Sequence, residues 1–180
     1  MARPTRRALL VSTGSLLTTV TAGCLGLVPS GRDPPEHDCS GIRRPTPDAP
    51  DEPNVVEPAS YSGPPSDPTD EGDLTSYVES FERAFRRNSL VREHDGGLVE
   101  FGIGDQETWT KSAPAGAGVA GIEYTFHYTD RRGTIADSGM NLAVYYVDTS
   151  VAVRAHERGR REDGTHPDPW EDGVTVACFD

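Results

Sequence analysis

The chain of 180 residues has almost no lysine and little positive charge of any kind. It holds 29 acidic residues against 17 basic ones, and Lys111 is its single lysine. A protein without a basic stripe cannot neutralise many phosphates, so the composition argues against nucleic-acid binding. Repulsion among so many carboxylates is tolerable where salt screens it, because the Debye length falls to about 3 Å at 1 M salt. The composition therefore indicates a protein adapted to brine.

The sequence also lacks the short motifs of common enzyme classes. It contains no nucleophile elbow, no HExxH zinc motif and no P-loop lysine. Residues 116–121 match the spacing GxGxxG, but a strand pattern follows them where a dinucleotide site needs a helix, so we expect a flexible loop there. Ser138 lies in a predicted turn with no base near it in sequence. We therefore expect no catalytic residue, no cofactor and no metal site.

An uncharged stretch from Ala8 to Val28 follows a pair of arginines near the N-terminus. Arg6 and Arg7 ahead of an apolar segment are typical of the twin-arginine route, which exports folded proteins. Thr21-Ala22-Gly23-Cys24 is similar to a lipobox, so we predict that residues 1–23 are a signal peptide and that Cys24 carries a lipid. The alternative is an uncleaved signal anchor, because the stretch is long enough to cross a bilayer. Either arrangement holds the chain on the outer face of the cell membrane.

Cysteine is scarce, with three residues in the whole chain. If Cys24 carries a lipid, Cys39 and Cys178 remain as an even pair in an oxidising compartment, which favours a disulfide between them. Such a bond would close a loop of about 140 residues and contribute up to about 5 kcal/mol in the chain-entropy account. Two free thiols are the alternative.

Proline is concentrated between the signal peptide and the rest of the chain. Residues 25–72 hold 11 of the 15 prolines and many acidic residues. A segment of this composition has too little apolar surface to offset the entropy of ordering, and like charges extend it. We therefore predict that residues 24–72 are a disordered linker between the lipid anchor and the domain.

Residues 73–180 are expected to form one small α+β domain. The apolar residues from Leu74 to Asn88 fall on one stripe at 100° per residue, which predicts an amphipathic helix with Glu82 and Arg86 on its charged side. The helix should be the N-terminal element of the domain and pack on an antiparallel meander sheet of four to five strands, because no crossover helices separate the strands. Apolar patterns predict the strands at 99–103, 122–128, 141–148, 151–156 and 174–179.

Two groups of residues are candidates for a functional surface. Exposed aromatic residues beside basic ones suit a binding surface, which points to a face made of Tyr145, Arg154, His156 and His127. The second group is the loop 162–172, which concentrates carboxylates and His166. Oxygen-rich loops can hold Ca²⁺, but the spacing in this loop fits no EF-hand and two prolines stiffen it. A solvated acidic loop is the simpler interpretation.

The layout resembles that of small twin-arginine-exported lipoproteins of halophilic archaea, which combine an arginine-pair signal, a lipobox, an acidic Pro-rich spacer and a compact C-terminal domain. The segment from Tyr77 to Asn88 looks like the leading helix of such domains. The resemblance implies a location and a fold class and brings no activity to carry over. The leading hypothesis is a non-catalytic domain that is anchored to the membrane and binds a protein or small ligand in the cell envelope.

Two alternatives remain beside that hypothesis. The first is an enzyme or a divalent-metal-binding module that uses the 162–172 loop with His156 or His166. The second is a structural component of the cell envelope.

Overall fold

The computed structural model describes residues 32–159 and 165–179. Within them the chain has an α+β fold with one α-helix and a six-stranded antiparallel sheet. The residues predicted to form the signal peptide, with Arg6, Arg7 and Cys24, lie outside this range and remain predictions. No described helix is long and apolar enough to span a bilayer. The elements are η1 (Cys39–Gly41), α1 (Glu71–Glu93), β1 (Leu98–Ala113), η2 (Pro114–Gly116), β2 (Ala117–Asp130), β3 (Ile135–Asp137), β4 (Asn141–Val147), β5 (Val151–Arg158) and β6 (Val174–Cys178).

Helix α1 begins and ends where local chemistry favours it. The side chain of Asp70 caps the first turn by accepting a hydrogen bond from the Asp73 amide at 3.0 Å. Acidic residues in the first turn and Arg92 in the last turn complement the helix dipole. Gly96 follows the helix with φ of 74°, a left-handed conformation that glycine adopts without strain. The predicted apolar stripe is buried, and it includes Leu74, Tyr77, Val78 and Phe81.

The sheet runs in the order β1-β2-β4-β5-β6, and every pair of neighbours is antiparallel. The predicted α+β class and antiparallel sheet are confirmed, while the predicted count of four to five strands is wrong. The additional strand is β3, whose three residues pair with β2 beyond the point where β4 ends. Strands this short leave no periodic pattern in the sequence.

The glycine-rich segment 116–121 is not the flexible loop that its composition suggested. Residues 117–121 form the first part of β2 and are buried. Gly121 lies beneath the indole of Trp109 on β1, where an added Cβ would come within 2.2 Å of the ring. Glycine is needed at this position because a neighbouring aromatic ring takes the space of a side chain. The glycines therefore reflect close packing between two strands.

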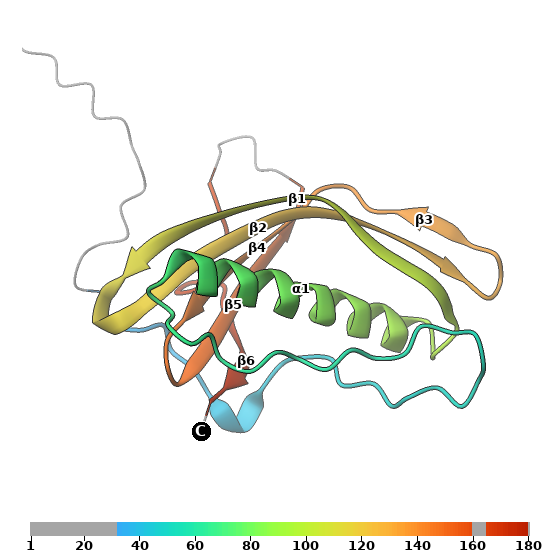
Figure 1. Ribbon diagram of the computed structural model, residues 1–180, viewed down its shortest axis with the longest axis horizontal. Coiled ribbons are helices and arrows are strands. Elements are labelled where there is room, and N and C mark those ends of the chain that lie inside the picture. The colour runs from blue at the N-terminus through green and yellow to red at the C-terminus, as the bar shows by residue number, and fades with distance from the viewer. Residues whose placement is uncertain (1–31, 160–164, 180) are drawn as a thin grey trace, which may run out of the picture.

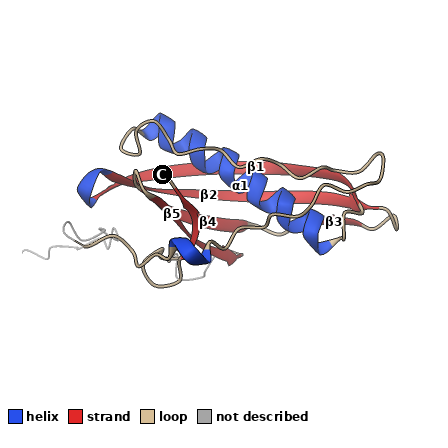
Figure 2. Ribbon diagram, turned by 90° about the horizontal axis from the view of Figure 1, so that it is seen from below, coloured by secondary structure: helices blue, strands red, loops and turns tan. Residues whose placement is uncertain are grey.

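Helix α1 covers one face of the sheet, as Figures 1 and 2 show. Alternation along the strands places Ile122 and Tyr124 on this face, in one core with the helix. The opposite face has its own buried cluster around Val144 and Val153, against which Trp109 and Trp170 pack. Both faces of the central strands are therefore covered, which explains why β4 is buried along its whole length.

Residues 32–70, which we call the strap, lie against the domain, so the prediction of a disordered linker is wrong for them. The Asn88 side chain on α1 accepts a hydrogen bond from the Ala59 amide at 2.7 Å and donates one to the Ala59 carbonyl at 2.9 Å. Figure 1 shows the strap running alongside α1. The composition of the strap predicted disorder wrongly, because proline has no amide donor to satisfy and can pack as an apolar side chain. Three strap prolines are buried: Pro35, Pro45 and Pro68.

A disulfide joins Cys39 to Cys178, the pair expected from the sequence. The two Cα atoms lie 5.8 Å apart, although the cysteines are separated by 139 residues. Beside the bond, the Arg43 amide donates to the Thr175 carbonyl at 2.7 Å. The bond therefore fastens the strap to β6, at the edge of the sheet opposite β1.

Candidate functional site

The expected binding face is not a surface. Tyr145 is fully buried and Arg154 is 6% exposed, and both point from the sheet towards α1. His127 is exposed and lies on the opposite face of the sheet, where its ring covers Gly102 of the neighbouring strand. The prediction failed because it assigned the four side chains to one face without knowing how the strands pair. The structure brings three of them together and separates His127.

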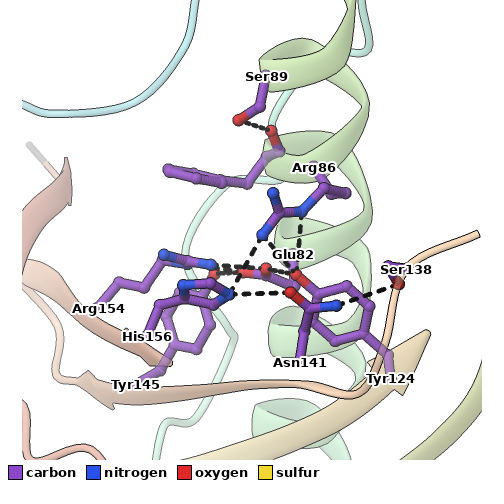
Figure 3. Close-up of polar contacts among 10 residues, drawn as sticks. Glu82, Arg86, Ser89, Tyr124, Ser138, Asn141, Tyr145, Arg154 and His156 are labelled. Carbon is purple, nitrogen blue, oxygen red and sulfur yellow. Dashed lines mark hydrogen bonds and ion pairs between the residues drawn. The ribbon is translucent and has the colours of Figure 1, made fainter. Parts of the chain in front are cut away.

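A buried ion pair lies at the centre of the interface between α1 and the sheet. Glu82 on α1 has no exposed surface. Arg154 on β5 donates to its carboxylate from Nε and from Nη2, each at 2.7 Å (Figure 3). This two-point geometry is the strongest arrangement of a guanidinium and a carboxylate. The aromatic ring of Phe85 lies 4.2 Å from the Arg154 guanidinium carbon and covers it.

Two tyrosines complete the hydrogen bonding of Glu82. The hydroxyl of Tyr124 donates to Oε1 and the hydroxyl of Tyr145 donates to Oε2. Burial by itself would raise the pKa of Glu82, but the Arg154 charge and these donors outweigh it and hold that pKa at about 2. Burial and the Glu82 charge raise the pKa of both phenols, so both remain neutral. The carboxylate therefore accepts four hydrogen bonds and has no capacity for another cation.

Arg86 is a second buried guanidinium in this cluster, one helical turn beyond Glu82. It is 6% exposed, and it donates to the Tyr124 hydroxyl from Nε at 3.2 Å and from Nη2 at 3.1 Å. Its guanidinium carbon lies 4.9 Å from the centre of the Phe126 ring. Among the described residues, no carboxylate oxygen lies within 4.0 Å of its nitrogen atoms. The cluster therefore holds two positive charges and one negative charge.

His156 on β5 lies beside Arg86 and is kept neutral by its surroundings. Burial lowers its pKa first, and the Arg154 charge lowers it further, to about 4. Its Nε2 atom lies 3.2 Å from Arg86 Nη2 and 3.3 Å from the Asn141 amide oxygen. A neutral ring nitrogen is either a donor or an acceptor, so it can satisfy one of these neighbours at a time. Because Arg86 only donates, Nε2 accepts from Arg86 when it lacks a proton.

Asn141 and Ser138 extend the cluster towards the end of β4. The Asn141 side chain donates to the Gly139 carbonyl at 2.9 Å and to the Ser138 hydroxyl at 3.2 Å. Ser138 Oγ also accepts from the Phe126 amide at 2.8 Å. Figure 3 shows that Asn141 stands between Ser138 and His156. The hydroxyl and the imidazole contact different atoms of the same amide and are not bonded to each other.

A cavity of about 440 Å³ opens beside this cluster, between the second half of α1 and the β2–β3–β4 end of the sheet. Arg86 and Asn141 belong both to the cluster and to the cavity lining. Leu90, Phe126 and Met140 supply apolar surface. Three exposed charged residues also line it: Glu93, Asp137 and Arg158.

The acidic loop proposed as an alternative metal site is described in part. His166 stacks against Trp109, with ring centres 5.2 Å apart, and Asp168 pairs with Arg32 at 3.1 Å. Residues 162–164 lie outside the described residues. No group of three or more His, Cys, Asp or Glu side chains arranged to hold a metal ion occurs in 32–159 and 165–179.

Known proteins give no guide to the function of the site, so its geometry alone supports an interpretation. No protein-family model, curated protein or solved structure matches the chain.

Four members of this cluster were not recognisable as such from the sequence: Glu82, Arg86, Tyr124 and Asn141. Glu82 and Arg86 were assigned to the charged side of the helix, although Glu82 lies next to the apolar stripe on a helical projection. A signal was present in β5, where Arg154 interrupts an otherwise apolar run from Val151 to Ala155. A buried arginine requires a carboxylate partner, and the helix packed on that face is the place to look for it.

Proposed function

We propose that this protein is exported, is anchored by a lipid on Cys24 to the outer face of the cell membrane, and binds a small ligand in the cell envelope without catalysing a reaction. The observation that carries the binding function is the cavity at the end of α1, whose wall contains the buried guanidinium of Arg86. Pockets of a few hundred cubic ångströms with apolar walls and a few fixed polar groups are typical ligand sites.

The polar groups around the cavity are arranged for binding. Glu82 has every acceptor position of its carboxylate occupied, so it is not available as a general base. Ser138 accepts hydrogen bonds from a backbone amide and from Asn141 and does not contact His156. Rigid groups held by one another favour recognition of a ligand, because little entropy is lost when it binds.

The test of the binding function is whether the cavity retains a molecule from the envelope. The purified full chain would be incubated with the small-molecule fraction of cell envelopes, washed and denatured, and the released compounds identified by mass spectrometry. Ala136→Trp would place an indole in the cavity that Ala136 lines. Ile135→Trp is the matched control, because the adjacent side chain on β3 is 75% exposed and points to the other face of the sheet.

We expect the unsubstituted chain and Ile135→Trp to enrich the same compound, and Ala136→Trp to lose it. Near-ultraviolet circular dichroism of each variant would verify that the fold is intact. Recovery of no compound, or of the same compound from Ala136→Trp, would refute the proposal that this cavity binds a compound of the cell envelope.

The anchor is tested separately by the intact mass of the protein extracted from native membranes. A mass equal to residues 24–180 plus lipid supports cleavage and lipidation at Cys24. An unlipidated mass that retains residues 1–23 would instead identify an uncleaved signal anchor.

A further inference from the structure

We propose that the cavity beside Arg86 binds a small molecule through a single carboxylate group, which supplies the counter-charge that the buried cluster lacks. The inference rests on the proposed binding function and specifies the class of ligand for that same cavity.

The charges of the buried cluster do not balance. The cluster holds two guanidiniums and one carboxylate, and that carboxylate is already saturated by Arg154, Tyr124 and Tyr145. The phenols stay neutral, so they do not offset the second positive charge. A buried cation without an anionic partner is costly, and an anion that reaches Arg86 would recover part of that cost.

Arg86 has hydrogen-bond donors left for a ligand. Its hydrogen bonds use Nε and Nη2, and Nη1 makes no hydrogen bond to any described residue. The residue lines the cavity while the Phe126 ring and the Tyr124 hydroxyl fix its plane. A guanidinium held in this way is prepared to donate to a planar, charged acceptor. A carboxylate is such an acceptor.

The lining of the cavity also constrains the rest of the ligand. Leu90, Phe126 and Met140 give the cavity an apolar wall next to Arg86. Glu93 lines its exposed part and would repel a second negative charge on the ligand, with Arg158 as the opposing cation. The cavity therefore favours a monoanion with an apolar body over a phosphate-type dianion.

Met140 offers a direct reporter of binding. The chain has two methionines, and the other is Met1. In the full chain labelled with ¹³C at the methionine methyl groups, the Met140 signal would be assigned by its loss in Met140→Leu. Benzoate, benzamide and phenylphosphonate would be titrated at one fixed ionic strength, because salt screens the charge that is being tested. The three probes share an aromatic body and carry one, no and up to two negative charges.

We expect benzoate to shift the Met140 signal saturably, and benzamide and phenylphosphonate to bind at least about 10-fold more weakly, because they lack the charge or carry too much of it. Arg86→Gln should weaken benzoate binding about 10- to 100-fold. Arg92→Gln is the matched control, since it removes an exposed arginine from the same helix, and it should leave benzoate binding unchanged.

Equal binding of benzoate and benzamide, or equal effects of Arg86→Gln and Arg92→Gln, would overturn the inference. The comparison of probes on the unsubstituted chain needs no variant, so it decides the matter even if Arg86→Gln does not fold. Suppose that benzoate and benzamide bind equally well, and that the unsubstituted chain retains an uncharged envelope compound which Ala136→Trp does not. The carboxylate inference then fails and the binding function stands. If no envelope compound is retained but benzoate binds through Arg86, the cavity recognises a carboxylate and the proposed binding of an envelope compound fails.

Discussion

Arg154 and Glu82 lie 72 residues apart in the chain and form a two-point ion pair between β5 and α1, with both partners buried. The pair connects α1, the one α-helix among the described residues, to the inner strand β5 of the sheet, and so helps to fix the position of α1 on the sheet. A buried ion pair is weak evidence of net stability, because desolvation offsets much of its attraction. Removing only one partner of the pair is strongly destabilising, since the remaining charge stays buried without a partner.

Replacing Glu82 with glutamine should therefore be severe. The change leaves Arg154 and Arg86 together without a carboxylate, and the free energy of unfolding should fall by about 3–5 kcal/mol. Urea unfolding at constant salt measures it. Glu93→Gln, an exposed change on the same helix, should stay within about 0.5 kcal/mol. The apolar double variant Glu82→Leu/Arg154→Met should recover much of the loss, and a loss below about 1 kcal/mol for Glu82→Gln alone would contradict the ion pair.

His156 should make stability depend on pH between about 4 and 6.5. Its pKa is lowered from 6.5 to about 4 in the folded state, so within this window the unfolded chain binds a proton that the folded chain does not. The free energy of unfolding should then fall as the pH drops through the window, by about 1–2 kcal/mol after allowance for partial exposure. The loss from Glu82 comes lower, as the pH falls from 4.5 towards 2.

Urea unfolding at several pH values, compared with the variant His156→Gln, isolates this contribution. The variant should show a flatter profile between pH 4 and 6.5 and the same decline below it. A profile unchanged by the substitution would mean that His156 titrates as it does in the unfolded chain.

The helix and the central strands were predictable because their patterns arise from local periodicity. Leu74, Val78 and Phe81 repeat at helical spacing, and the run at 141–148 is apolar on both faces. The cysteine pair was predictable from the number of cysteines and from the oxidising compartment that the sequence predicts. These features depend on residues close in sequence or on simple composition.

The candidate site was not predictable in the same way, because its residues come together only when the strands pair and the helix packs on the sheet. Tyr145 and Arg154 are opposite each other on β4 and β5, but the sequence does not say which face of those strands meets the helix. From the sequence, Glu82 is expected at the surface, and only the pairing of its carboxylate with Arg154 explains its burial. The strap shows the same limit, because its docking depends on Asn88 and on Cys178, neither of which lies in the strap.

The packing of Trp109 on Gly121 gives a prediction for the opposite face of the sheet. Gly121→Ala would bring a methyl group within 2.2 Å of the indole, so the variant should lose about 1–3 kcal/mol in urea unfolding. Gly63→Ala is the matched control, because nothing lies within 4 Å of its added Cβ. In a Trp170→Phe background, fluorescence should report displacement of Trp109.

The double variant Gly121→Ala/Trp109→Leu tests whether the indole is the cause. Its loss should be smaller than the sum of the two single losses, since the smaller side chain leaves room for the methyl group. If the two losses of unfolding free energy are additive, the destabilisation by Gly121→Ala does not come from contact with the indole.

The disulfide should hold one half of the strap, and Asn88 the other. The variant Cys39→Ser/Cys178→Ser opens a loop of 139 residues and should lower the free energy of unfolding by about 2–5 kcal/mol. Hydrogen exchange at the Arg43 amide, which bonds to Thr175 of β6, should accelerate at least about 10-fold through local opening. The Ala59 amide, which bonds to Asn88, should change much less.

Reduction of the unsubstituted chain should reproduce this difference between the two amides, while Asn88→Ala should reverse it by releasing Ala59 and leaving Arg43 protected. Equal acceleration at both sites after loss of the disulfide would mean that the strap detaches as one unit. Unequal acceleration would show that two independent fastenings hold a proline-rich segment to the domain. If Cys24 carries the proposed lipid, the distance between the domain and the membrane would then be set by residues ahead of Cys39 and not by the whole stretch 24–72.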